Sequence, residues 1–255
     1  MNTKTPISVI ILAKNEADNI GECISSIKSF ASEIIVCDDK STDSTANTSK
    51  KLGALVISAS ESSSFAEKRN EAMKHSQNDW VLFVDADERV DSVMGNWLEG
   101  LVIADHVAGY RLSRVDYFWG KELRRGEVAS AFQYGITRLI NRKYAVFQGQ
   151  VHEIANIKPP YVVQKGEGRL KHHAHSSISE FIRDVNEYSS QRALELQGQE
   201  SIPVTLFKLI FFPLGKFINS YFFKLGFLDG APGFAYSFVM SFHSFLVRAK
   251  ILTLF

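Results

Sequence analysis

The amino-acid sequence predicts an α/β fold in which helices flank a mainly parallel sheet. Within residues 7–90, short runs of β-branched and apolar residues alternate with segments in which apolar residues recur at helical spacing. The connections between these segments are short, which favours right-handed crossovers between parallel strands. Acidic or polar residues follow three of the predicted strands. Because ligands of such sheets bind at the carboxyl ends of the strands, the sequence also predicts a ligand site at that edge.

Four segments have the composition of strands that are covered on both faces, because they are nearly continuous apolar runs. They are residues 7–13 (ISVIILA), 33–39 (EIIVCDD), 54–58 (ALVIS) and 80–87 (WVLFVDAD). The polar residues at or just beyond their ends are Asn15 and Glu16, Asp38 and Asp39, and Asp85 and Asp87. We therefore expect these side chains to face one crevice.

The segments between the predicted strands have features of helices. Apolar residues recur at helical spacing in residues 20–31, and Glu16 and Asp18 favour a helix N-terminus just before them. Residues 41–53 (STDSTANTSKKLG) begin with helix-capping residues and end in a glycine. Residues 64–76 (SFAEKRNEAMKHS) place their apolar residues on or near one helix face. Each of the first three predicted strands is thus followed by a predicted helix.

The rest of the chain changes character twice. Residues 91–175 contain strand-like segments with interleaved aromatic and basic residues, and residues 177–197 predict a polar amphipathic helix. Of the 19 phenylalanines, 12 lie in residues 203–255, where basic residues outnumber the single acid, Asp229. We therefore expect three parts, namely residues 1–90, 91–200 and 201–255.

Composition and charge exclude several classes of protein. The net charge of +1 argues against a dedicated nucleic-acid binder. Two cysteines, Cys23 and Cys37, are too few for a disulfide framework in a chain of 255 residues, which favours a reducing compartment. The apolar run near the N-terminus is short and is followed at once by charged residues, so we expect no secretion signal and a cytoplasmic location.

The Asp85-Ala86-Asp87 stretch predicts a cation site for a phosphorylated ligand. Carboxylate oxygens are the ligands that Mg²⁺ and Mn²⁺ prefer, and these cations often share a diphosphate. A lone pair of acids at a strand end is more often simply solvated. Here the pair follows a buried strand and coincides with acids at two other strand ends, which favours the functional interpretation.

Four stretches resemble a known family in their order and approximate spacing. ISVIILAKNEADNI, EIIVCDDKSTDST, AEKRNEAM and WVLFVDADE are similar to motifs of the family 2 inverting glycosyltransferases, which have the GT-A fold with a Rossmann-like sheet. Downstream stretches, such as FQGQVHE, LKHHAHS and GFLDGAPGF, resemble the subgroup of lipopolysaccharide core β-1,4-glucosyltransferases. One departure is Lys40, where the family often has glycine. Lysine is less suited to a positive φ, so we expect a differently shaped loop there.

The resemblance implies a nucleotide-sugar-binding half over residues 1–90 and an acceptor-side half over residues 91–200. On the nucleotide side, Asp39 would accept a hydrogen bond from the uracil of a UDP-sugar, with Asp38 helping. Ala13 and Glu16 would lie under the nucleotide.

The same resemblance assigns the phosphate side. Arg69, with Lys68 beside it, would face the phosphates or the ribose, since a guanidinium matches phosphate oxygens. Asp85 would contact the ribose, and Asp87 would hold a Mg²⁺ or Mn²⁺ ion. Without the resemblance, Arg69 could equally be a charge on a helix surface.

Glu153 in the VHE stretch is the predicted general base. An inverting transfer needs a base that takes the proton of the acceptor hydroxyl, and a carboxylate is the usual choice. His152 would orient Glu153 or touch the donor. Glu88 and Asp87 are weaker candidates for the base, and the alternative for the VHE stretch is an exposed pair in a loop.

The HHAH stretch, residues 172–175, suggests a further metal ligand. If it forms a helix or turn, His172 and His175 point the same way. The resemblance suggests that one of them, His172 before His175, completes the metal shell beside Asp87. A zinc site needs more ligands than this stretch offers. A polar loop rich in histidine is the alternative.

The C-terminal part, residues 201–255, predicts a hydrophobic and basic helical extension. Helices with Lys or Arg beside Phe and Leu dock on anionic membrane surfaces. Residues 225–247 are long enough to span a membrane, but three glycines, a proline and Asp229 interrupt them. We expect docking in the membrane plane, with burial in a core and spanning as alternatives.

Together these features predict transfer of a hexose, expected to be glucose, from a UDP-sugar to a lipopolysaccharide core or other lipid-linked saccharide. The enzyme would be peripheral on the inner face of the cytoplasmic membrane. A nucleotidyltransferase is one alternative, but it usually has a Gly-rich basic loop after the first strand, where this chain has AKNEADN. A non-catalytic binding module is the other alternative. Such a module should lack some of the acidic residues that this chain retains.

Overall fold

The computed structural model describes residues 5–60, 64–149, 154–175, 177–199 and 201–253. The chain forms two compact units. The first unit comprises Met1–Arg114 and Tyr134–His172, and the second comprises Val115–Gln133 and His173–Phe255. The division of the chain by role at residues 90 and 200 stays a prediction, since it concerns what each part does.

Four parallel strands form one half of the main sheet in the first unit. They are β1 (Ile7–Ala13), β2 (Glu33–Asp38), β3 (Leu55–Ser58) and β4 (Trp80–Asp85), in the order β3-β2-β1-β4. These are the four strands predicted from the apolar runs. β1 and β4 are buried along almost their whole length, as expected for strands covered on both faces.

Further strands extend the sheet beyond β4. The order continues β8-β6-β11-β5, with β8 antiparallel to both β4 and β6, and β5 antiparallel to β11. These strands are β5 (Glu88–Val90), β6 (Val107–Phe118), β8 (Ile136–Asn141) and β11 (Val162–His175). β9 (Ala145–Gln148) and β10 (Ile154–Ile157) form a separate two-stranded ribbon.

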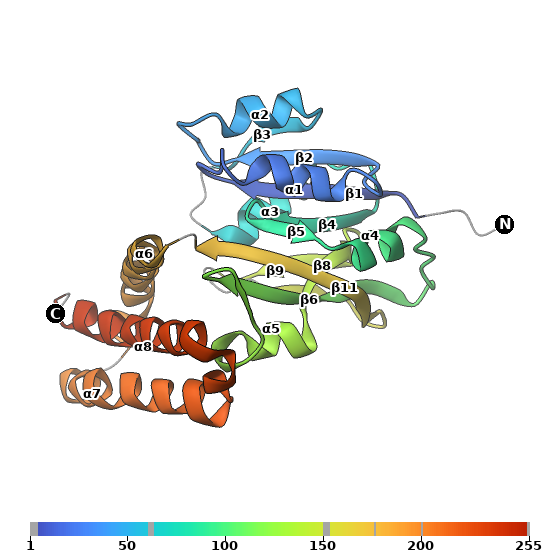
Figure 1. Ribbon diagram of the computed structural model, residues 1–255. Helices are drawn as coiled ribbons and strands as arrows, with labels where there is room; N and C mark the ends of the chain where they lie inside the picture. The colour runs from blue at the N-terminus through green and yellow to red at the C-terminus, as the bar shows by residue number, and fades with distance from the viewer. Residues whose placement is uncertain (1–4, 61–63, 150–153, 176, 200, 254–255) are drawn as a thin grey trace. The chain divides into compact units, whose positions relative to one another are not determined.

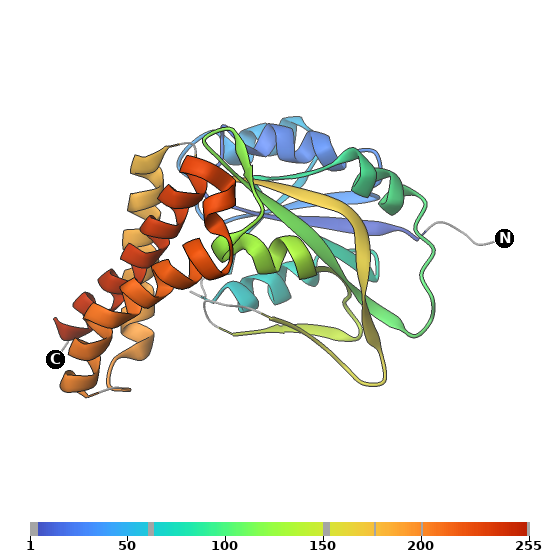
Figure 2. The ribbon, with the colours of Figure 1, turned by 60° about the horizontal axis from the view of Figure 1, so that its bottom comes forward.

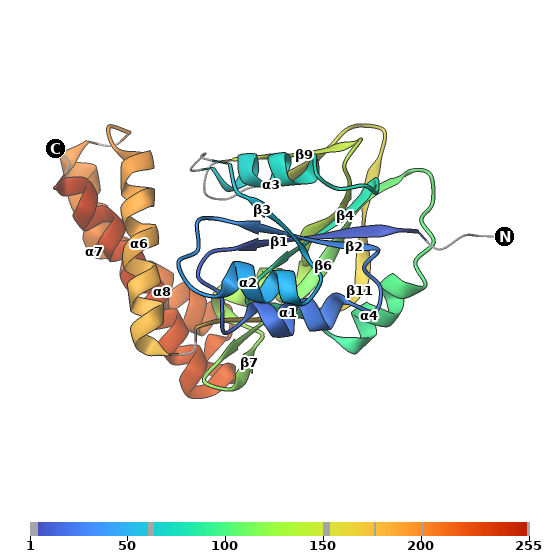
Figure 3. The same ribbon diagram turned by 90° about the horizontal axis from the view of Figure 1, so that it is seen from above.

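Helices cover both faces of the parallel half of the sheet. They are α1 (Ile20–Ile27), α2 (Thr45–Lys51), α3 (Phe65–Met73) and α4 (Ser92–Glu99). Figure 3 shows α1, α2 and α4 on one face, and α3 with β9 on the other. The core divides in the same way, because alternate residues of β1 enter different clusters. Val9 and Ile11 pack with α1 and α4, whereas Ile10 packs with α3 and β9.

The second unit is mainly helical. It holds β7 (Lys121–Leu123), η1 (Gly126–Val128), α6 (Ile178–Leu196), α7 (Ile202–Ile218), η2 (Asn219–Phe223), η3 (Gly226–Asp229) and α8 (Gly230–Leu252). α5 (Ala129–Tyr134) contains the point at which the chain returns to the first unit. α8 lies between α6 and α7 (Figure 1), and Figure 2 shows the three helices side by side from a second direction. The amphipathic helix predicted at residues 177–197 is α6.

The end of α7 and the start of α8 meet in a tight arrangement of small residues. A Cβ atom on Gly233 would lie 2.2 Å from the carbonyl oxygen of Gly226, so only glycine fits there. The buried hydroxyl groups of Ser220 and Ser237 are 3.0 Å apart. Leu225 adopts a left-handed conformation at φ 58°. The chain therefore turns sharply between the two helices, and residues 225–247 do not form one continuous helix, which further disfavours the alternative that they span a membrane.

Candidate active site

Strands β1, β2 and β4 bring the predicted donor-site residues to one edge of the sheet. Ala13 at the end of β1 is in register with Asp38 at the end of β2, and Leu12 is in register with Asp85 at the end of β4. Parallel strands end on the same side, so these carboxylates share one edge, as the sequence predicted. Ala13 itself is buried.

Asp39 and Lys68 form an ion pair at this edge. Lys68 Nζ lies 2.8 Å from Asp39 Oδ2, and the Asp39 N–H donates to the Ala13 carbonyl at 2.8 Å. Asp38 accepts from the Ser41 N–H at 3.3 Å through Oδ2. Its Oδ1 is buried and has no hydrogen-bond partner among the described residues. One carboxylate oxygen of Asp38 therefore lacks a hydrogen bond within the described part of the chain.

Lys40 adopts the positive φ that its glycine-like position in the sequence suggested. Its φ is 57°, in the left-handed region that favours glycine. The lysine takes up the conformation that favours glycine, and the expectation of a differently shaped loop stays a prediction. The loop keeps its turn at some cost in backbone strain.

Glu16 belongs to a network that ties the loop after β1 to the loop after β2. Its N–H donates to Thr45 Oγ1 at 2.8 Å, and its carboxylate accepts from Asn19 Nδ2 at 2.8 Å. The Thr42 N–H donates to Asn15 Oδ1 at 2.8 Å. These bonds hold the two loops that would border a bound nucleotide.

Asp85 is held by two arginines. Arg69 Nη2 lies 3.1 Å from its Oδ1, and Arg138 donates to both carboxylate oxygens. Burial disfavours ionisation of Asp85, but the guanidinium groups of Arg138 and Arg69 outweigh it and hold the pKa of the carboxyl well below its usual range. Arg138, on β8, was not among the predicted site residues. Its only local signal is a basic residue inside the predicted strand segment ITRLIN.

Arg69 is enclosed by the core. It is 3% exposed, and its guanidinium carbon lies 5.0 Å from the ring centre of Phe83 and 5.6 Å from that of Phe147. This burial favours a role of Arg69 through Asp85 over direct contact with a diphosphate. Lys68, on the same helix, is 14% exposed and faces the strand ends through Asp39.

Glu88 is a buried member of the same cluster as Asp85 and Arg138. It is fully buried, accepts the Asp85 N–H at 2.9 Å and lies 3.5 Å from Arg138. Burial raises the pKa of its carboxyl. An enclosed carboxyl does not reach an acceptor hydroxyl, so Glu88 is disfavoured as the alternative general base.

Asp87 and His172 face each other on neighbouring segments. His172 Nε2 lies 3.3 Å from Asp87 Oδ2, and β11 pairs with β5 so that His172 is in register with Glu88. The other oxygen of Asp87, Oδ1, is buried and has no hydrogen-bond partner among the described residues. An oxygen and an imidazole nitrogen in this arrangement fit a divalent cation. No group of three metal-ligating side chains gathers in the described part of the chain, so the remaining ligands would come from a diphosphate or water.

His175 lies on a strand, so residues 172–175 do not form the helix or turn that would aim both histidines the same way. Both histidines belong to β11, and residues three apart on a strand point to opposite faces. His175 Nδ1 lies 3.4 Å from Asp184 Oδ2 on α6, and its ring stacks on Phe181 at 4.1 Å. The geometry therefore favours His172 as the metal ligand and gives His175 a packing role.

The predicted base Glu153 and its neighbour His152 lie outside the described residues. The segment before them is anchored to α3, the helix that carries Lys68 and Arg69. Asn70 Nδ2 donates to the Phe147 carbonyl, and the Phe147 N–H donates to Asn70 Oδ1, both at 2.9 Å. Ser64 Oγ donates to the Gly149 carbonyl at 3.3 Å.

Comparison with known proteins identifies the family to which this arrangement of strand-end acids belongs. The description of glycosyl transferase family 2 matches residues 8–144, more than half of the 255 residues. The chain belongs to this family. It is therefore a glycosyltransferase with the predicted α/β fold, which favours transfer over the nucleotidyltransferase and binding-module alternatives.

Relatives extend the similarity over nearly the whole glycosyltransferase. A lipopolysaccharide core biosynthesis glycosyltransferase of Rhizobium meliloti is 30% identical, over 98% of this chain and 93% of its own. An uncharacterized glycosyltransferase of Rickettsia prowazekii is 28% identical, over 96% of this chain and 86% of its own. Among solved structures, mannosyl-3-phosphoglycerate synthase from Rubrobacter xylanophilus is 19% identical with a TM-score of 0.48, over 75% of this chain and 74% of its own.

Proposed function

We propose that this glycosyltransferase transfers a hexose, with inversion, from a UDP-sugar to a lipopolysaccharide core or other lipid-linked saccharide. The observation that carries the proposal is the cluster of strand-end carboxylates, each with a cationic or imidazole neighbour: Asp39 with Lys68, Asp85 with two arginines, and Asp87 with His172. The relative named for lipopolysaccharide core biosynthesis supports the choice of acceptor.

The donor would lie across the ends of β1, β2 and β4. Asp39 would accept the uracil N–H through the oxygen that Lys68 does not occupy, with Asp38 beside it. Ala13 and Glu16 would lie under the nucleotide, and Lys68 would reach the phosphates. Asp85 would accept from the ribose while its guanidinium partners hold it ionised and oriented.

Asp87 and His172 would hold a Mg²⁺ or Mn²⁺ ion. Such an ion, when bound, neutralises the charge that develops on the departing diphosphate. The chain's own contribution is to leave one oxygen of Asp87 without a hydrogen bond among the described residues and to place the imidazole of His172 3.3 Å from the other.

Glu153 would act as the general base. Its carboxylate would take the proton of the acceptor hydroxyl while that oxygen attacks the anomeric carbon from the face opposite UDP. The bond between the sugar and the diphosphate breaks, its electron pair leaves with UDP, and the proton stays on Glu153. One bond forms as one breaks, which inverts the anomeric centre.

The second unit would dock on an anionic membrane surface. On α7, Thr205 is the one buried residue, whereas Phe207, Ile210 and Leu214 are each more than half exposed. Apolar exposure on this scale marks an interaction surface. In the described part of the chain, Ile202–Phe223 is long and apolar enough to cross a membrane by length and composition. Docking in the membrane plane is favoured, because α7 packs lengthwise on α8 and carries two lysines.

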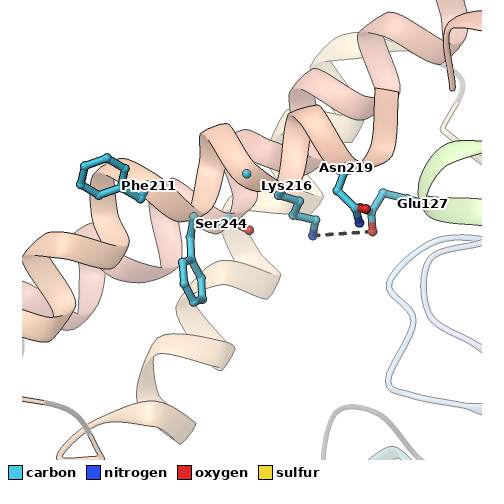
Figure 4. Close-up of a pocket in the computed structure, with 7 residues that line it drawn as sticks. Glu127, Phe211, Lys216, Asn219 and Ser244 are labelled. Atoms are coloured by element: carbon cyan, nitrogen blue, oxygen red, sulfur yellow. Dashed lines mark ion pairs between the residues drawn. The ribbon is translucent and has the colours of Figure 1, made fainter. Parts of the chain in front are cut away.

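A shallow hollow on this surface combines apolar and charged groups (Figure 4). Its volume is about 430 Å³, and it is lined by Glu127, Phe211, Phe212, Gly215, Lys216, Asn219 and Ser244. Lys216 reaches across it to Glu127 at 3.7 Å. The pair keeps charge at one end of an apolar surface, as expected for a helix that lies at the boundary between headgroups and acyl chains.

UDP release tests the transferase. The purified chain would be incubated with Mg²⁺ or Mn²⁺, with UDP-glucose, UDP-galactose or UDP-N-acetylglucosamine, and with deacylated lipopolysaccharide core. We expect release with one donor, and a loss of about 10²-fold or more in Asp87→Ala and Glu153→Gln. Asp105→Ala and Glu167→Gln, at exposed positions, are the matched controls. Full activity of Glu153→Gln would refute the base, and failure of the chain to bind UDP would refute the whole proposal.

A further inference from the structure

We propose that the hollow between β7 and η3 in the second unit binds the phosphate of an anionic phospholipid headgroup. The inference rests on the proposed membrane docking and names the lipid chemistry that the docking surface selects. The hollow has a volume of about 490 Å³. It is lined by Lys121, Glu122, Arg124, Arg125, Leu228, Asp229 and Gly230.

The hollow is lined by three basic residues and two acidic ones, and both acids already accept hydrogen bonds. Lys121, Arg124 and Arg125 are all exposed. Glu122 already accepts from Tyr117 Oη at 2.8 Å and from Arg124 Nε at 2.9 Å. Within the described residues, no ion pair engages Lys121 or Arg125. Lys121 and Arg125 are thus the two cations with which a bound anion would pair.

Asp229 fixes the backbone of the arginine pair. Its Oδ2 accepts the N–H groups of Arg124 and Arg125, each at 2.9 Å. Asp229 is the one acidic residue in residues 203–255, and its carboxylate is already engaged by these two backbone amides. The Gly126 N–H adds a bond to the Lys224 carbonyl at 3.0 Å. The two arginines therefore project from a backbone held at three consecutive residues, which lowers the entropy lost when they bind.

Leu228 lines the hollow with the cations, and Phe223 and Phe227 lie within five residues of it in the sequence. These apolar side chains favour a lipid over a soluble phosphate. Phe223 is 77% exposed, Leu228 52% and Phe227 42%. Such side chains enter the boundary between headgroups and acyl chains, at a depth where arginine and lysine meet lipid phosphates. The planar donors of arginine match phosphate oxygens. A soluble phosphate would leave these three side chains in water.

A second copy of the chain is a poorer occupant. A two-fold symmetric contact through this face would place the same open cations opposite one another. Like charges brought together in this way oppose association. An anionic lipid surface has the complementary charge.

Vesicle sedimentation of the full chain tests the site. We would compare phosphatidylcholine vesicles with vesicles that also contain phosphatidylglycerol, for wild type and for the double variant Lys121→Gln/Arg125→Gln. We expect tighter binding of wild type to the phosphatidylglycerol vesicles, and a loss of about tenfold to thirtyfold in the double variant on those vesicles only. The matched control is Lys50→Gln/Lys51→Gln, which removes the same charge from the exposed end of α2.

The outcomes separate this inference from the proposed docking. If the double variant binds phosphatidylglycerol vesicles as wild type does, or if the α2 control loses as much, the headgroup site is refuted while docking stands. If wild type binds neither kind of vesicle, docking itself fails. Turnover of deacylated acceptor should be unchanged in the double variant. A raised KM for that acceptor would show that the hollow holds the acceptor and would overturn the lipid assignment.

Discussion

Arg138 donates to both oxygens of Asp85 and lies 3.5 Å from Glu88, so a single guanidinium serves two carboxylates. Glu88 in turn accepts the backbone N–H of Asp85. The three residues form a closed arrangement behind the strand end, in which Glu88 Oε1 is buried and has Arg138 as its nearest cation, without a hydrogen bond among the described residues. Breaking such a buried network is costly, because the remaining charges lose their partners.

Replacement of Arg138 should lower both stability and donor binding. Arg138→Met would leave Glu88 buried without its cation, at a cost of about 3 kcal/mol in the free energy of unfolding. Arg138→Lys keeps the charge but loses the forked contact to Asp85, so we expect a smaller loss of stability and weaker UDP binding. Thermal unfolding and calorimetric titration with UDP measure the two effects.

The control for Arg138 is Arg111→Met on the neighbouring strand β6. Arg111 is exposed and is paired in register with Thr137, so its loss should change stability by less than about 0.5 kcal/mol. Equal effects of the two arginine-to-methionine changes would contradict the proposed role of the cluster. Normal UDP binding in Arg138→Lys would show that the forked contact is not needed.

At the scale of elements, the sequence predicted those segments whose pattern is local. β1, β2 and β4 are apolar runs, and their conformation follows from their own composition. β11 is different, because KGEGRLKHHAH is polar and its extended form depends on pairing with β5, far away in the chain. The site role of Arg138 was not predicted for the same reason, because its partner Asp85 is 53 residues away in the sequence. Non-local contacts of this kind leave no periodic signal in the sequence.

Two helix glycines should respond in opposite ways to alanine. Gly233→Ala in α8 would place a Cβ atom 2.2 Å from the Gly226 carbonyl oxygen, and the backbone would have to move to relieve this close contact. We expect a loss of about 1–3 kcal/mol in unfolding free energy. Gly215→Ala in α7 meets nothing within 4 Å, so its better helix propensity should add up to about 1 kcal/mol. Thermal unfolding of both variants checks the signs, and a stabilising Gly233→Ala would refute the tight contact.

At the scale of the whole molecule, the two units carry different chemistry. The first unit holds the strand-end carboxylates, and the second holds the exposed apolar helix α7 and the basic hollow. The proposed site for the nucleotide sugar and the proposed docking surface therefore lie in separate parts of the fold. Their contributions to activity should be separable by the physical state of the acceptor.

Loss of docking should impair transfer to a membrane-embedded acceptor and spare transfer to a soluble one. Phe207 and Phe211 are 59% and 52% exposed on α7, with ring centres 4.5 Å apart. Phe207→Ser/Phe211→Ser should weaken vesicle binding at least tenfold, because burial of each Phe side chain contributes roughly 1.5–3 kcal/mol. UDP release should fall with acceptor in vesicles, whereas kcat/KM on deacylated acceptor should not change.

The matched control for these phenylalanines is Leu55→Ser/Val93→Ser in the first unit, at positions that are 53% and 56% exposed. It removes exposed apolar side chains without touching α7, so vesicle binding should be kept. Equal loss of turnover on both forms of the acceptor in Phe207→Ser/Phe211→Ser would mean that α7 serves the catalytic site itself. In that case the exposed face of α7 would be needed for transfer chemistry and not for bringing the enzyme to its lipid-anchored substrate.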